Sequence, residues 1–112
     1  MDRIGMEDFQ KVDVRVGRIV RVEDFPKARK PAFQLWVDFG ELGTRKSSAQ
    51  LVSLYAKEQL LGRLVLAVVN FPPRQIADFM SEVLVLGVPL DAGQTVVLIG
   101  PDRDVPLGGR LF

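Results

Sequence analysis

The sequence predicts an all-β domain, a small five-stranded barrel with Greek-key connections and one helix between its third and fourth strands. Three observations lead to this prediction. Short segments rich in β-branched and aromatic residues follow one another, separated by glycine and proline turn signals. One helix-like segment follows the third of them, and no strand-helix-strand alternation repeats. The 112 residues fit one domain, residues 1–112, and 47% of them are hydrophobic, which is enough for a core.

The N-terminal part predicts a short helix followed by a long strand. Residues 6–12 carry Phe9 and Val12 at helical spacing, but the segment is too short to stand alone and must pack on something. Residues 13–23 alternate as a strand until Arg18 breaks the apolar phase. We therefore expect a bulge or bend near Gly17, of the kind that turns the corner of a small barrel.

The next segment is the clearest strand of the sequence, at residues 32–39. Its apolar residues alternate, and Trp36 falls on the less buried face, where it is either covered by another part of the chain or used in a contact. A cationic loop bracketed by prolines, residues 25–31, precedes this strand. The turn at 40–43 leads to a third, more polar strand at 44–49.

The second half supplies the helix and the remaining strands. Residues 53–61 read as a helix that Gly62 ends. A helix between the third and fourth strands favours an OB-type barrel over the alternatives, an SH3-like barrel or an α+β sandwich. The run at 64–69 lacks alternation, which predicts a strand covered on both faces. Two further strands are expected at 83–86 and 94–99. Residues 105–112 form a C-terminal extension, and this apolar tail is expected to dock on the barrel or on a second subunit.

The composition argues against an enzyme. The sequence contains no cysteine and no histidine, which excludes disulfides, thiolate metal sites and the usual catalytic triads. No paired carboxylates and no phosphate-binding glycine loop are visible, and we expect no metal or cofactor. No apolar run approaches the ~20 residues of a membrane helix, and the N-terminus lacks the apolar core of a signal peptide. These features predict a cytoplasmic domain without membrane insertion.

The stretch at 70–82 is predicted to be a recognition loop for extended peptides. Pro72 and Pro73 stiffen it, and it places large apolar residues among polar ones in a segment expected near the surface. Polar groups of residues 46–50 would give the resulting pocket a hydrogen-bonding rim. The alternative is that Phe71 and Phe79 only fill the barrel mouth. The candidate peptide-binding residues are Ser47, Ser48, Gln50, Asn70, Phe71, Arg74, Phe79, Met80, Ser81 and Glu82.

Charge is unevenly distributed along the chain, although the net charge is only +1. Residues 11–30 hold seven Lys and Arg against three Asp and Glu. This asymmetry permits an anionic partner such as RNA. Strand faces that are simply exposed to solvent would give the same charge distribution. OB barrels place oligonucleotides on the face of strands two and three and the neighbouring loops. The candidate RNA-binding residues are Lys27, Arg29, Lys30, Arg45, Lys46 and Arg74.

Several stretches resemble a known family. Residues 8–20, Asp-Phe-Gln-Lys-Val-Asp-Val-Arg-Val-Gly-Arg-Ile-Val, resemble the opening of the tRNA-binding OB-fold family. That family includes free-standing bacterial tRNA-binding proteins and the C-terminal appendix of methionyl-tRNA synthetases. Residues 25–29, 46–50 and 70–87 resemble one subgroup, the CsaA proteins.

The resemblance carries expectations about function and partners. It implies a homodimer assembled through N- and C-terminal extensions, and an export-related chaperone that binds unfolded precursor polypeptides and is linked to the translocation motor. The alternative is a structure-specific tRNA-binding protein. Residues 81–84 read Ser-Glu-Val-Leu where the tRNA-binding relatives have Ser-Gln-Gly-Met. An anionic Glu82 there would repel phosphate and favour a peptide's amide or cationic groups.

Overall fold

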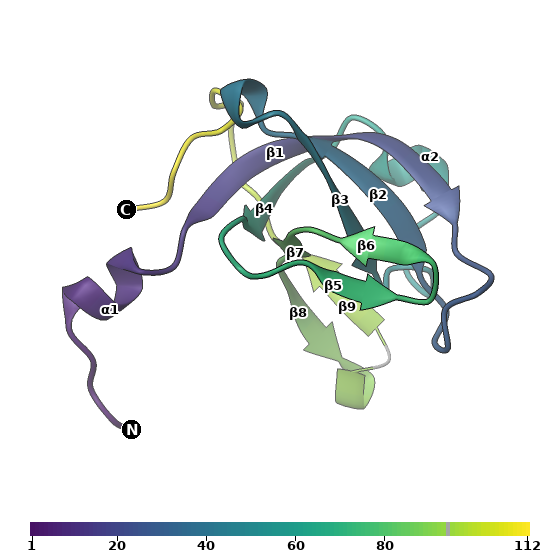
Figure 1. Ribbon diagram of the computed structural model, residues 1–112, viewed down its shortest axis with the longest axis horizontal. Helices are drawn as coiled ribbons and strands as arrows, with labels where there is room; N and C mark the ends of the chain where they lie inside the picture. Colours follow the sequence, from purple (N-terminus) through teal and green to yellow (C-terminus); the bar gives the residue numbers. More distant parts are fainter. Residues whose placement is uncertain (94) are drawn as a thin grey trace.

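The computed structural model describes residues 1–93 and 95–112 and shows a nearly closed antiparallel barrel (Figure 1). Five strands form the main sheet in the order β3-β2-β1-β4-β7, and two further hairpins, β5–β6 and β8–β9, lie beside it. The elements are α1 (Met6–Gln10), β1 (Val14–Asp24), β2 (Phe33–Asp38), η1 (Gly40–Leu42), β3 (Thr44–Ala49), α2 (Lys57–Leu60), β4 (Leu64–Val68), β5 (Arg74–Ile76), β6 (Phe79–Ser81), β7 (Leu84–Val85), β8 (Gly87–Leu90), η2 (Asp91–Gly93) and β9 (Thr95–Leu98).

This strand order confirms the predicted OB-type barrel. Strand β1 pairs with β2 along one edge and with β4 along the other, while β7 joins the far side of β4. Helix α2 lies between β3 and β4 in the chain, where the sequence predicts a helix. The barrel interior is filled by apolar side chains from β1, β2 and β4 with Phe39, Leu51, Leu60 and Val83, and the fully buried residues include Ile19, Leu35, Val37, Phe39, Leu60 and Val65.

The expected bulge lies three residues later than predicted. The β1–β2 register shifts between Ile19 and Arg21, so Val20 is the extra residue. Gly17 serves a different purpose, because a Cβ built there would lie 2.4 Å from Cγ1 of Val37 and 2.7 Å from Cε1 of Phe39. The glycine therefore allows close packing inside the barrel, and the bend itself needs no glycine.

Helix α2 is shorter than the predicted helix at 53–61. It begins at Lys57, where the Gln59 side chain accepts a hydrogen bond from the Ala56 backbone N–H at 2.8 Å. Tyr55 lies before the helix, and its hydroxyl accepts a hydrogen bond from the Leu98 backbone N–H on β9. The predicted end holds, because Gly62 adopts a left-handed conformation with φ of 83°. Contact with β9 thus replaces the first helical turn.

Two hairpins were not anticipated. The recognition loop at 70–82 contains the short hairpin β5–β6, whose Ile76 pairs with Phe79. The predicted strand at 94–99 is present as Thr95–Leu98, while Gln94 lies outside the described residues. Its partner β8 contains Pro89, a residue that argues against a strand unless the strand lies at an edge.

The chain ends extend from the same side of the barrel (Figure 1). The C-terminal tail docks on β1 by backbone hydrogen bonds, from Gly108 N–H to Val16 O at 2.8 Å and from Leu111 N–H to Val14 O at 3.0 Å. The sequence predicts that the tail docks either on the barrel or on a second subunit, and in the structure it docks on the barrel. Phe112, at the end, remains exposed.

Candidate functional site

The barrel closes incompletely between β3 and β7. The backbone N–H groups of Glu82 and Val83 both donate to the Lys46 carbonyl, at 2.8 and 3.2 Å. Side chains accept hydrogen bonds from two backbone amides of β3. Glu82 Oε1 accepts from Lys46 N–H at 2.9 Å, and Ser81 Oγ accepts from Ser48 N–H at 3.0 Å. Two edge amides of β3 are therefore satisfied by side chains of residues 81 and 82 and not by a strand partner.

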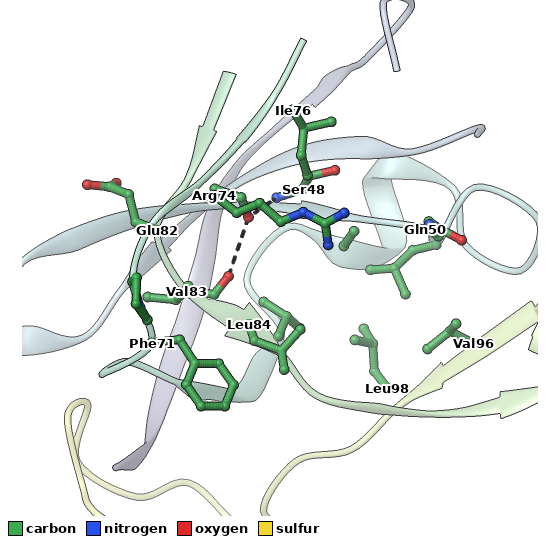
Figure 2. Close-up of a pocket in the computed structure, with 15 residues that line it drawn as sticks. Ser48, Gln50, Phe71, Arg74, Ile76, Glu82, Val83, Leu84, Val96 and Leu98 are labelled. Carbon is green, nitrogen blue, oxygen red and sulfur yellow. Dashed lines mark hydrogen bonds between the residues drawn. The ribbon is translucent and has the colours of Figure 1, made fainter. Parts of the chain in front are cut away.

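An apolar cavity of about 460 Å³ opens beside this seam (Figure 2). Six of the ten predicted peptide-binding residues line it. They are Ser48, Gln50, Phe71, Arg74, Ser81 and Glu82. Phe71 is about half exposed, at 49% of the residue, and Pro72 lies beside it in the lining. The cavity thus combines an exposed apolar wall with hydrogen-bonding groups, a combination that suits a peptide site.

Sequence reasoning missed most of the apolar wall. Leu84 and Val85 form β7, and Val83 immediately precedes it. Two others, Val96 and Leu98, come from β9. The alternation of Val96 and Leu98 on one face was visible in the sequence, but no local pattern indicates that this face meets the 70–82 stretch. Ala49, Leu51 and Ile76 complete the missed apolar lining.

Three predicted residues on β3 and β6 lie outside the apolar cavity. Phe79 is buried, with its ring 5.4 Å from that of Phe25 and edge-on to that of Trp36 at 5.9 Å. It belongs to a small apolar cluster with Phe25 and Ala32, separate from the barrel interior, and it covers Trp36 on the outer face of β2. Ser47 is buried at 1% exposure, whereas Met80 is exposed and does not line the cavity.

Asn70 also lies outside the cavity, in a backbone clamp. Its Oδ1 accepts a hydrogen bond from Asp13 N–H at 2.9 Å, and its Nδ2 donates to the Lys11 carbonyl at 2.8 Å. Both partners belong to the segment between α1 and β1. The side chain therefore ties the N-terminal segment to the end of β4, and its predicted role in peptide binding remains a prediction.

A second, cationic cavity of about 520 Å³ lies between the loop at 25–31 and the β5–β6 hairpin. It is lined by four of the six predicted RNA-binding residues, Lys27, Arg29, Lys30 and Arg74. Lys27 Nζ lies 2.9 Å from Asp78 Oδ2, and this hydrogen bond holds the pKa of Asp78 below its ordinary value of 3.8. Within the described chain, no ion pair involves Arg29, Lys30 or Arg74.

The other two predicted RNA-binding residues lie on β3, outside the cationic cavity. Lys46 places its Nζ 5.1 Å from the centre of the Phe79 ring, a cation–π contact, and Arg45 is half-buried. The described residues contain no group of three or more acidic side chains that could hold a metal ion. No helix in residues 1–93 or 95–112 is long and apolar enough to cross a membrane.

The family model that matches the chain is described as a putative tRNA-binding domain, and it covers residues 14–110. Curated relatives include the methionine–tRNA ligases of Thermococcus onnurineus, 37% identical over 111 residues, and of Methanosarcina acetivorans, 33% identical over 111 residues. Each match covers 99% of this chain. The chain spans only about 15% of the length of these ligases.

Solved structures of similar proteins match the whole chain. The chaperone CsaA of Bacillus anthracis is 46% identical with a TM-score of 0.93, covering 99% of this chain and 100% of that one. The CsaA chaperone protein of Picrophilus torridus is 47% identical with a TM-score of 0.89, covering 98% and 100%. A methionyl-tRNA-synthetase-related protein of Pyrococcus horikoshii is 26% identical with a TM-score of 0.86 over 100% of both chains. The chain therefore belongs to the tRNA-binding-domain family and is an OB-fold protein of the CsaA type.

Proposed function

We propose that this protein is a CsaA-like chaperone that binds unfolded or precursor polypeptide segments and assists their export. The observation that carries the proposal is the apolar cavity beside the β3–β7 seam, with its exposed Phe71 and its polar rim. An exposed apolar wall with few fixed polar groups suits segments of varied sequence, because apolar contact is not directional. The likeness to proteins named as CsaA chaperones supports the same reading.

The proposal includes the partners and the cellular setting. The protein acts in the cytoplasm as a homodimer, is not an enzyme, and hands its clients to the export translocation motor. The matching family model describes a tRNA-binding rather than a catalytic domain, which supports the absence of catalysis. One OB-fold unit, residues 1–112, carries the activity.

Replacing Phe71 with Ala tests the peptide site. The ring lines the cavity but is half exposed, so its loss should weaken binding of unfolded polypeptide with little effect on the fold. We expect about a tenfold or greater rise in Kd for a reduced, unfolded test protein, since an aromatic anchor contributes on the order of 1–2 kcal/mol. Fluorescence anisotropy measures the affinity, and thermal unfolding checks the fold.

Leu90→Ala is the matched control. Leu90 is exposed to nearly the same extent, 48%, but lies on β8 outside the apolar cavity. The control should bind as the unaltered protein does. Equal affinities for all three proteins would contradict a peptide site at Phe71, and absence of any polypeptide binding would contradict the chaperone function itself.

A second function, structure-specific tRNA binding, is favoured by one separate observation. Arg29, Lys30 and Arg74 form no ion pair in the described chain, so their charge is available to an anionic backbone. Binding should then fall steeply with salt, because each phosphate contact releases counterions. A filter-binding titration of tRNA at low and high salt measures this dependence, and no binding at low salt would exclude the function.

A further inference from the structure

The apolar and cationic cavities are adjacent, and we refer to the two together as the groove. Four residues, Ser48, Gln50, Arg74 and Ile76, line both of them. Figure 2 shows the Arg74 side chain directed across the apolar cavity towards Gln50. A segment seated against Phe71 would therefore reach Arg74 within the same groove and enter the cationic cavity beyond it.

Cationic side chains predominate among the charged residues that line this groove. The carboxylate of Glu82 lines the apolar part, but it accepts the hydrogen bond of Lys46 N–H and points away from Arg74 (Figure 2). In the cationic part, Asp78 is paired with Lys27. Among the charged residues that line the two cavities, Arg29, Lys30, Arg74 and Glu82 form no ion pair in the described chain, so three unpaired cations stand against one carboxylate. An anionic group bound in the cationic cavity would meet guanidinium and ammonium donors, and Glu82 does not line that cavity.

We infer that the groove selects polypeptide segments in which an acidic side chain, or a C-terminal carboxylate, lies close to a large apolar residue. This inference rests on the proposed chaperone function and names its client class. The apolar residue packs against Phe71 and the β7–β9 wall, and the carboxylate binds Arg74 and the cations of the 25–31 loop. It differs from the expectation from sequence that Glu82 would favour cationic groups, because the unpaired cations of the groove outnumber this single carboxylate.

A peptide is favoured over RNA as the occupant because of what surrounds the cations. The apolar cavity that continues from Arg74 is lined by aliphatic residues with Phe71 and Pro72, which suits aliphatic and aromatic side chains. The other aromatic rings near the hairpin, Trp36 and Phe79, pack against each other, and Phe79 is buried. Stacking of successive bases needs exposed aromatic faces, and this groove offers that of Phe71.

The test compares three synthetic peptides with the same Phe- and Leu-containing core, flanked by Glu, by Gln or by Lys. Anisotropy titrations at low salt should give the Glu peptide at least about fivefold tighter binding than the Gln peptide, the gain expected from one or two exposed ion pairs. The Lys peptide should bind more weakly than the Gln peptide. The difference should shrink at high salt, where exposed charges are screened.

The variant Arg29→Gln/Lys30→Gln tests the site. Its Glu-to-Gln affinity ratio should fall towards one, whereas Arg103→Gln, which removes an exposed charge outside both cavities, should keep the ratio of the unaltered protein. An unaltered protein that binds all three peptides equally would overturn the inference and leave the chaperone function standing. No binding of any peptide would overturn both. The affinity for a competing tRNA is measured with the same variants. If the Arg29→Gln/Lys30→Gln change weakens tRNA binding but leaves the Glu-to-Gln affinity ratio unchanged, these cations bind RNA and not the peptide.

Discussion

Several polar side chains near the site form hydrogen bonds with backbone groups of this protein. Ser81 and Glu82 satisfy amides of β3 where no strand partner reaches them, and Asn70 satisfies two groups of the segment before β1. Such bonds hold in place a loop that would otherwise leave backbone donors unpaired. The same side chains can line a site and support it, as Ser81 and Glu82 do. Asn70 is the one whose supporting role can be measured alone, because it lies outside both cavities.

Replacing Asn70 with Ala should lower the free energy of unfolding by about 1–2 kcal/mol. The change removes two hydrogen bonds, each of which contributes about 0.5–1.5 kcal/mol. Urea denaturation followed by tryptophan fluorescence measures the effect. Glu41→Ala, at an exposed position of η1 whose side chain makes no hydrogen bond or ion pair in the described chain, is the control and should change stability by less than about 0.5 kcal/mol. Weaker peptide binding with unchanged stability would instead favour the binding role predicted from the sequence.

At the scale of elements, an ionic cluster links β1 to the C-terminal tail. Asp13 Oδ1 lies 2.6 Å from Arg15 Nε and 3.4 Å from Arg110 Nε, while Arg15 also donates to the Gly108 carbonyl at 2.9 Å. The hydrogen bond from Arg15, with the charges of Arg15 and Arg110, holds the pKa of Asp13 below its ordinary value of 3.8, against the opposing effect of burial. The tail is thus bound to β1 by charge as well as by backbone hydrogen bonds.

The stability that Asp13 contributes should depend on pH. Because its pKa is lowered by folding, the contribution is complete above the ordinary value of 3.8 and is lost as pH falls through the folded-state value. The difference in unfolding free energy between the unaltered protein and Asp13→Asn should therefore be constant from pH 5 to 7 and should shrink below 3.8. Denaturant titrations across this range measure it. Asp104→Asn, an exposed position without an ion pair in the described chain, should show no such trend.

The elements also show how far the sequence could be interpreted. Strands β1 and β2 follow from apolar alternation, and β4 and β7 follow from apolar runs, patterns that depend only on neighbours along the chain. The hairpin β5–β6 could not be found in that way, because its strands have three residues each and its turn uses Ala77 with a positive φ of 52° in place of the usual glycine. Likewise β8 was missed because Pro89 argues against a strand.

The site could be predicted in part for a similar reason. Phe71 and Arg74 belong to a loop whose composition is unusual by itself, and both line the cavity. Val96 and Leu98 line it only because β9 folds back beside β7, a contact between distant segments that no local pattern specifies. The same holds for Phe79, since its burial depends on Phe25 and Trp36.

In the molecule as a whole, apolar side chains are exposed near both the N-terminus and the C-terminus of the chain. Helix α1 contains no buried residue, although Met6 and Phe9 are among its side chains. These two residues and the tail residues Leu111 and Phe112 border a further cavity of about 560 Å³. An isolated helix of five residues is not stable in water, so a packing partner is expected. We propose a second copy of the chain as this partner, in line with the homodimer that the family resemblance implies.

The proposed homodimer predicts that truncation of this surface produces monomers. The double variant Phe9→Ala/Phe112→Ala should raise the dimer dissociation constant by about 30-fold or more, the equivalent of about 2 kcal/mol for the loss of two aromatic contacts. Light scattering across a concentration series measures the shift. Val88→Ala removes a comparably exposed apolar side chain from β8, and it should leave the dissociation constant unchanged because Val88 lies outside the cavity between α1 and the tail. If the unaltered protein is a monomer at micromolar concentration, α1 must be stabilised by something other than a second copy.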